Sequence, residues 1–191
     1  LYYTKMLGGN HMSASVSRPQ ITARISDLVK KHIDPNNDPR IYWAKEVTFD
    51  YASEHSIRVD FMRYKPVNNS VSGIEKGDFY CYEVKSSEED FHSKNGHNFI
   101  GDFNYYVMPE DVYENVKKLI PWDVGVYVPD DSSLHCVKKA RRKNRTRPIS
   151  VMLLMMWRSS RREIVSIRRQ EREKQIDKEL DDAFEKESDA I

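Results

Sequence analysis

The chain has 191 residues, of which 32% are charged and 39% are hydrophobic, and its net charge is +1. It contains no run of about 18 uncharged apolar residues, which excludes a membrane-spanning helix. Its two cysteines, Cys81 and Cys136, provide neither a disulfide framework nor the spacing of a metal site. We therefore expect a soluble protein from a reducing compartment such as the cytoplasm.

Three parts can be distinguished along the chain. Residues 1–18 include the segment Leu1 to Met12, which differs in character from the rest, and we interpret them as a leader or tag without fixed structure. Residues 19–131 combine apolar periodicity with turn residues and are expected to form the folded core. Residues 132–191 are expected to form a helical extension, basic at first and acidic at its end.

The first half of the core predicts one helix and two strands. Apolar residues from Ile21 to Ile33 recur at the helical period, and the run 34–39, rich in proline and asparagine, ends that helix. Residues 41–49 are rich in aromatic and β-branched side chains, and residues 56–64 alternate between apolar and polar, so both predict strands. The segment 65–78 predicts a loop or hairpin connection.

The second half predicts an alternation of strands and helices. We expect a helix from Ser87 to roughly Gly101, because Ser87 can cap it. Asp130 to Ser133 is expected to close the core, and residues 150–188 predict one long helix or two shorter ones. The remaining expected elements are a strand over 79–85, a strand over 104–108, a helix over 109–119 and a strand over 124–128. This order predicts an α/β fold, a mixed β-sheet flanked by helices, with a C-terminal helical extension.

Charged residues interrupt two of the expected strands. Glu83 and Lys85 stand at the end of an otherwise apolar strand, where the alternation of side chains places both on one face. Asp60 lies within the alternating strand before it. A carboxylate or a lysine is seldom buried without a partner, because removing a lone charge from water is costly. These three residues are therefore candidates for a site, although Glu-Val-Lys as a triplet occurs about once by chance in such a chain.

This set of residues suits phosphodiester hydrolysis. The carboxylates of Asp60 and Glu83, helped by the backbone carbonyl of Val84, can hold one or two Mg²⁺ ions, which prefer oxygen ligands. A lysine on the same face can stabilise the negative charge that grows on the phosphate. The competing interpretation is a surface salt bridge between Glu83 and Lys85, with Asp60 merely solvated.

Three stretches of the core together resemble the MmcB-like branch of the PD-(D/E)xK nuclease superfamily, whose members occur in bacteria and prophages. They are Arg58–Phe61, Glu83–Phe91 and Asp102–Pro109, and the strand Val124–Val128 after Ile120-Pro121 continues the likeness. The match extends over residues 41–128, about half of the chain.

The resemblance implies a restriction-endonuclease-like fold and a nuclease that cuts DNA with Mg²⁺ or Mn²⁺. Asp60 and Glu83 would be the metal ligands and Lys85 the catalytic lysine. Glu46 would be an additional acid, although it lies on an expected strand and such nucleases usually carry this acid on the first helix. The implied role is DNA repair or phage DNA processing in the cytoplasm of a bacterium or phage-infected host. The alternative is a catalytically inactive module of the same fold that binds nucleic acid or recruits a partner.

Charge is distributed unevenly in the C-terminal third. Fourteen Lys or Arg residues lie between Lys138 and Lys174, opposed by three glutamates, and the tail after Gln175 is acidic. The basic block suits contact with DNA phosphates, while a solvated helical face or an oligomerisation helix explains it equally well. A homo-oligomer or a partner protein could therefore bind through the C-terminal helices. The candidates for nucleic-acid binding are Lys138, Lys139, Arg141, Arg142, Lys143, Arg145 and Arg147.

Overall fold

The computed structural model describes the backbone of residues 17–188 and the side chains of residues 17–181. Of the expected leader, residues 1–16 lie outside the described residues. Its last residue, Arg18, is the first residue of helix α1. In chain order the elements are α1 (Arg18–Ile33), β1 (Tyr42–Phe49), β2 (Ile57–Lys65), α2 (Val71–Glu75), β3 (Asp78–Val84), α3 (Glu88–His92), β4 (Phe103–Val107), α4 (Glu110–Val116), β5 (Gly125–Pro129), β6 (Leu134–Lys138) and α5 (Ile149–Ser188).

The six strands form one mixed sheet in the order β1-β2-β3-β4-β5-β6. β2 is antiparallel to both β1 and β3, whereas β4 runs parallel to β3 and β5. The last strand, β6, returns antiparallel to β5. The expected α/β class, with a mixed sheet flanked by helices and a C-terminal helical extension, is therefore confirmed.

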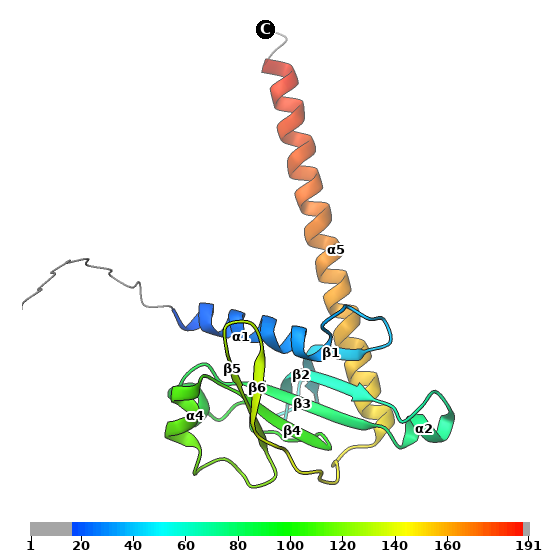
Figure 1. Ribbon diagram of the computed structural model, residues 1–191. Coiled ribbons are helices and arrows are strands. Elements are labelled where there is room, and N and C mark those ends of the chain that lie inside the picture. Colours follow the sequence, from blue (N-terminus) through cyan, green and yellow to red (C-terminus); the bar gives the residue numbers. More distant parts are fainter. Residues whose placement is uncertain (1–16, 189–191) are drawn as a thin grey trace, which may run out of the picture.

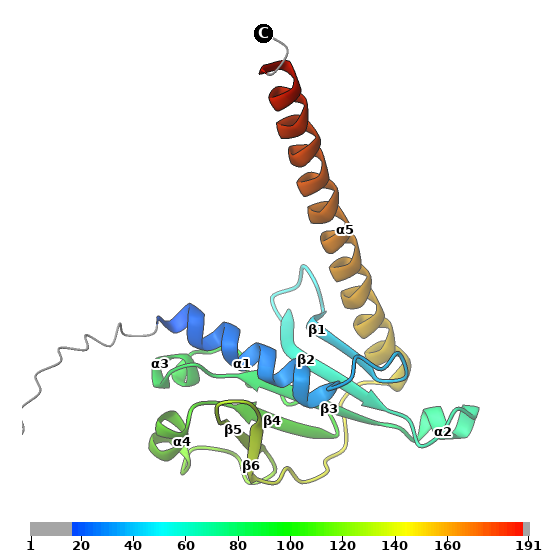
Figure 2. The same ribbon diagram turned by 45° about the horizontal axis from the view of Figure 1, so that its top comes forward.

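Helices cover both faces of this sheet (Figure 1, Figure 2). On one face α1 packs Val29 and Ile33 into a core with Phe61 and Tyr82 of the central strands. On the other face the first turns of α5 add Met152 and Met156 to a second core. α3 and α4 pack against the β4 and β5 part of the sheet in a third core. The result is a three-layer sandwich.

Strand β3 shows how the sequence alternation produces this arrangement. Its residues Tyr82 and Val84 belong to the core beneath α1, whereas Phe79 and Cys81 belong to the core beneath α5. Glu83 follows Phe79 and Cys81 on the same side, because successive side chains on a strand alternate between faces. The apolar alternation of β3 therefore carries a carboxylate into the buried layer.

The sheet continues beyond the point where we expected it to end. Asp130 to Ser133 do not close the core but form a hairpin turn, in which the Asp130 carboxylate accepts hydrogen bonds from the backbone amides of Ser132 and Ser133. β6 follows this turn, so the expected boundary between the core and the extension at 131/132 is wrong. The core includes residues up to Lys138.

The helix expected from Ser87 to roughly Gly101 is much shorter than predicted. Ser87 does cap it, accepting a hydrogen bond from the backbone amide of Asp90. The helix ends at His92, and the chain then takes an irregular path in which Gly96 has a φ of +73°. This conformation favours glycine, and the path after α3 contributes directly to the site described below.

The C-terminal region from Ile149 to Ser188 forms a single helix, α5. Its beginning lies against β1, and the rest projects away from the sheet (Figure 1). Every side chain from Ile164 to Asp181 is exposed. Among the described residues, no helix is long and apolar enough to cross a membrane.

Candidate active site

One row of the sheet carries acidic residues on three neighbouring strands. The last pair of the β2–β3 ladder is Phe61 with Tyr82, and Asp60 and Glu83 are the next residues of their strands. In the β1–β2 ladder Glu46 and Asp60 stand between the pairs Lys45 with Phe61 and Val47 with Val59. Asp60 and Glu83 line the same cleft, and the negative charge of Asp60 helps to raise the pKa of Glu83, so the two carboxylates lie close together.

The Asp60 carboxylate is fixed by the strand next to it. Its Oδ2 accepts a hydrogen bond of 2.8 Å from the backbone amide of Val84. Burial raises the pKa of Asp60, the Val84 amide opposes this shift, and the neighbouring negative charge of Glu46 adds to it. The protein thus holds one oxygen of this carboxylate in place and makes its charge unfavourable in the absence of a cation.

The Glu83 carboxylate is the most unusual group of the site. It is 3% exposed, and its Oε1 has no hydrogen-bond partner among the residues that the structure describes. Burial, and after it the nearby Asp60 carboxylate, raises the pKa of Glu83 to about 9. An unsatisfied buried carboxylate oxygen is costly for a fold, and such groups in native proteins call for an explanation such as a bound ion.

Lys85 places its amine in the same space. The residue is 2% exposed, and its Nζ donates hydrogen bonds to the backbone carbonyls of Asp90 at 3.1 Å and Asn95 at 2.6 Å. An added Cβ at Gly96 would lie 2.9 Å from Lys85 Nζ and 3.2 Å from Glu83 Oε2. The segment after α3 therefore passes directly over both charged groups, and burial lowers the pKa of Lys85.

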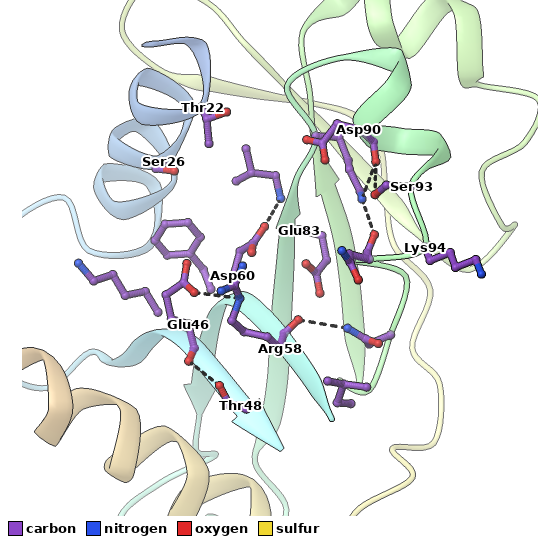
Figure 3. A pocket seen from close by; sticks show the side chains of 18 of the residues that line it. Thr22, Ser26, Glu46, Thr48, Arg58, Asp60, Glu83, Asp90, Ser93 and Lys94 are labelled. Carbon is purple, nitrogen blue, oxygen red and sulfur yellow. Dashed lines mark hydrogen bonds and ion pairs between the residues drawn. The ribbon is translucent and has the colours of Figure 1, made fainter. Parts of the chain in front are cut away.

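An open cleft of about 1250 Å³ gives access to these residues. It lies between α1, the β1–β2 hairpin and the segment after α3, and Asp60 and Glu83 project into its middle (Figure 3). Both are thus within reach of a ligand from solvent. Besides Lys85, the Lys and Arg residues that line the cleft are Arg18, Lys30, Lys45, Arg58 and Lys94.

Glu46 lies in the acidic row but is turned to another partner. Its carboxylate forms an ion pair with Arg58 at 2.9 Å, and its backbone has a φ of +54°, which is rare for a residue with a side chain. α5 holds this backbone, because Ser159 Oγ donates to the carbonyl of Lys45 at 2.5 Å and lies 3.1 Å from that of Glu46. Glu46 therefore lines the same cleft as Asp60 and Glu83, with its carboxylate paired to Arg58.

The chemistry of the donor groups suits a hard divalent cation. Within residues 17–181, no group of three or more His, Cys, Asp or Glu side chains is arranged to hold a metal. Mg²⁺ does not need such a group, because it commonly binds one or two carboxylates and keeps several waters. The Asp60 and Glu83 carboxylates, with the carbonyl of Val84 directly after Glu83, fit that requirement, and Glu83 Oε1, which has no partner within residues 17–181, can serve as a ligand atom.

Comparison with known proteins reveals one structural likeness. A solved protein of unknown function from Silicibacter pomeroyi superposes with a TM-score of 0.53 at 18% sequence identity, which covers 83% of this chain and 96% of that one. The likeness shows the fold alone. No family model matches the chain, and no curated protein matches it.

The basic residues predicted to bind nucleic acid lie at the end of β6 and in the segment that joins β6 to α5. We call residues 138–147 the strap, because several of its side chains bind carboxylates and carbonyls of the folded core. Arg142 pairs with Asp78, and Arg145 pairs with buried Asp102 at 2.9 Å. Asp78 is the first residue of β3 and Glu83 the sixth, so the strap crosses the opposite end of the strands, roughly 17 Å from the carboxylates. These cations therefore lie apart from the carboxylates, and their contact with nucleic acid stays a prediction.

The other members of the basic block are also engaged or distant. Lys138 donates to the Pro121 carbonyl at 2.6 Å, Lys143 lies 3.8 Å from Asp123, and Arg147 pairs with Asp50. Lys139 and Arg141 are exposed on the same strap. Ion pairs within the fold therefore account for part of the positive charge of this segment.

Sequence reasoning missed the residues that hold the Lys85 amine. The carbonyls of Asp90 and Asn95 belong to a segment that we expected to be helical, and backbone carbonyls leave no trace in residue types. His97 secures that segment, because its ring lies within hydrogen-bonding distance of the Tyr106 hydroxyl and, at 2.9 Å, of the Phe91 carbonyl. The signal that could have found this segment is Gly96, which interrupts the helical pattern directly beside His97.

Proposed function

We propose that this protein is a divalent-metal-dependent nuclease that hydrolyses phosphodiester bonds in DNA. The observation that carries the proposal is the unpartnered, buried Oε1 of Glu83 beside the Asp60 carboxylate, in a cleft that also holds the Lys85 amine. The resemblance of residues 41–128 to the PD-(D/E)xK superfamily and its restriction-endonuclease-like fold supports the same reading.

Each residue of the site then has a defined task. Asp60 and Glu83 hold the cation, with the Val84 carbonyl as a further ligand atom. When bound, a divalent cation polarises a phosphoryl oxygen and lowers the pKa of a water molecule. Lys85 is fixed by two carbonyls, so its remaining N–H is free to donate to a phosphate oxygen on which negative charge develops. The cationic lining of the cleft, including exposed Arg58 and Lys94, supports a polyanionic substrate.

The proposal is tested by incubating the full chain with circular plasmid DNA and with single-stranded oligonucleotides, in Mg²⁺, in Mn²⁺ and in chelator. Cleavage is expected with either metal and not in chelator. The variants Asp60→Asn, Glu83→Gln and Lys85→Met should each lose it. Asp111→Asn, which changes an exposed acid on α4, is the matched control and should cut like the unaltered protein.

Metal binding gives a readout that does not depend on turnover. Titration with Mn²⁺, followed by electron paramagnetic resonance, should show a site that Asp60→Asn and Glu83→Gln weaken and Lys85→Met leaves in place. Cleavage that persists in all three variants would contradict the proposal. Binding of DNA and Mn²⁺ by the unaltered protein without cleavage would instead favour the inactive nucleic-acid-binding module.

A further inference from the structure

The free half of α5 is a helix without a partner. From Ile164 to Asp181 all 18 side chains are exposed, including the aliphatic residues Val165, Ile176 and Leu180, which are 57%, 49% and 52% exposed. An isolated helix of about 12–15 residues is marginal in water, and most helical stability in proteins comes from packing of an apolar face. This segment therefore has a surface that another element can cover.

One side of this segment forms a continuous stripe. At 3.6 residues per turn, positions 165, 169, 172, 176 and 180 fall within roughly 80° of each other around the helix axis. The stripe is apolar at its ends and carries Arg169 and Arg172 in the middle. Ile164 and Ile167 lie on a different side of the helix and do not belong to it.

Charge divides the segment into two halves of opposite sign. Residues 164–172 contain three arginines and one glutamate, whereas residues 173–181 contain four acidic residues and two lysines. The two halves are equal in length and carry net charges of +2 and −2. A parallel neighbour of the same sequence would set like charges together, whereas an antiparallel one would set each half against its opposite.

We propose that α5 pairs antiparallel with α5 of a second copy of this chain, about a two-fold axis between residues 172 and 173. In this register Val165 lies opposite Leu180 of the other copy, so the apolar ends of the stripe meet. Val165 exchanges with Leu180 and Arg169 with Ile176, whereas Arg172 lies opposite Glu173 beside the stripe, so the same surface is used on both copies, as a symmetric interface requires. The opposite-charge pair nearest the axis is Arg172 with Glu173, and symmetry forms it twice.

The stripe lies apart from the candidate active site, because none of its residues lines the cleft. The described overlap of 18 residues is about 27 Å long. The cleft lies between α1, the β1–β2 hairpin and the segment after α3, away from the stripe. The dimer proposal therefore does not depend on the proposed nuclease activity, and an experiment can contradict one proposal without contradicting the other.

Sedimentation equilibrium of the full chain is the first test. We expect a monomer–dimer equilibrium that shifts toward monomer as NaCl is raised from 0.05 to about 1 M, because exposed charge pairs are screened by salt. Val165→Asp should give a monomer at every concentration. Ile167→Asp is the matched control, because it adds the same charge two residues away on another side of the helix, and it should leave the dimer intact.

A charge exchange tests the register. Arg172→Glu sets two glutamates against each other at the axis and should weaken the dimer at least about 10-fold. Arg172→Glu combined with Glu173→Arg restores opposite charges and should recover most of that loss. Equal weakening in the single and the double variant would contradict the register.

Spin labels distinguish the direction of pairing. With exposed Cys136 replaced by serine, a label is attached to Cys introduced at Ser166 or at Glu179. Because these positions are equally far from the axis, antiparallel helices give both labels the same axial separation of about 20 Å. A parallel pair would bring each label within about one helix diameter of its counterpart. A chain that stays monomeric at all concentrations, or whose α5 arginines prove necessary for binding DNA instead, overturns the proposal.

Discussion

The two ends of strand β3 each bury a carboxylate, and they treat it in opposite ways. At the first end Asp102 is 2% exposed, and its Oδ2 accepts hydrogen bonds of 2.9 Å from the Phe79 amide and from Arg145. At the other end Glu83 is 3% exposed, and its Oε1 has no partner within the described part of the chain. Burial alone therefore does not identify a site.

The difference lies in what surrounds each group. Asp102 is compensated by a cation from the strap between β6 and α5, so its role is to fix the strap to the sheet. Glu83 has another carboxylate, Asp60, as its neighbour, and burial and this neighbour raise its pKa to about 9. A buried carboxylate that is paired stabilises a fold, whereas one that lacks compensation indicates a place where a ligand completes the structure.

Removing the compensated carboxylate should have the largest effect on stability. Asp102→Ala leaves Arg145 without its partner and the Phe79 amide without an acceptor, and we expect the free energy of unfolding to fall by about 3–5 kcal/mol. Urea denaturation measures this change. Asp78→Ala is the control, because its partner Arg142 is largely exposed and such pairs contribute roughly 0–1 kcal/mol. Equal losses in the two variants would show that burial of Asp102 does not matter.

Removing the charge of Glu83 should have the opposite effect, because metal affinity should fall while stability is kept. Glu83→Gln keeps the shape of the side chain and removes its charge, so the metal-free protein should be at least as stable as before. Loss of an outer hydrogen-bonding partner of a metal ligand typically lowers metal affinity 10–100-fold, so loss of a ligand should weaken Mn²⁺ binding by at least about 100-fold. Calorimetric titration and urea denaturation of the same sample test both statements. A large loss of stability with unchanged Mn²⁺ affinity would make Glu83 a structural residue.

The pH dependence of stability tests whether Glu83 is buried without a compensating charge. Between its usual pKa of 4.5 and about 9, Glu83 binds a proton in the folded state and releases it in the unfolded state. The folded state therefore holds more protons, and the stability of the metal-free protein should fall as pH rises through this range and level off above it. One such group gives a slope of at most about 1.4 kcal/mol per pH unit.

The check is a series of urea denaturations in chelator at pH 5 to 9. The unaltered protein should lose more stability over this range than Glu83→Gln, because only the former has this group to titrate. Parallel curves for the two proteins would mean that Glu83 does not change its protonation between the folded and unfolded states. Mg²⁺ should reduce the slope, because a cation favours the ionised carboxylate.

The alternation of residues in β3 was enough to predict that Glu83 and Lys85 lie together, because successive side chains of a strand point to opposite faces. In β2 the expected alternation is wrong, because Val59 packs in the same core as Met62 and Phe61 packs in the core on the other face. Such local periodicity also predicted α1, and of the one long or two shorter helices expected in the C-terminal region the structure has one. The candidate carboxylates were therefore accessible from sequence.

Ion-pair and strand-pairing partners that are distant in sequence could not be predicted. Arg145 lies 43 residues from Asp102 and Arg147 lies 97 residues from Asp50, so the sequence does not reveal that these arginines have carboxylate partners. β6 was missed for a related reason, because the polar turn Asp130 to Ser133 looks like the end of a domain until β5 is present to pair with the next strand. The short α3 was missed because the carbonyls that hold Lys85 Nζ require an irregular backbone, which residue types do not reveal.

The smallest effect concerns the contact through which α5 supports the site. The Ser159 hydroxyl holds the carbonyl of Lys45, beside Glu46 with its φ of +54°, and a buried hydrogen bond of this kind contributes about 1 kcal/mol. Ser159→Ala should therefore lower the free energy of unfolding by about that amount, while Ser160→Ala changes it little. Glycine adopts a positive φ without strain, so the cost of Ser159→Ala should shrink when Glu46→Gly is also present. A double-mutant cycle measures this coupling, and strictly additive effects would show that Ser159 does not support the backbone of Glu46.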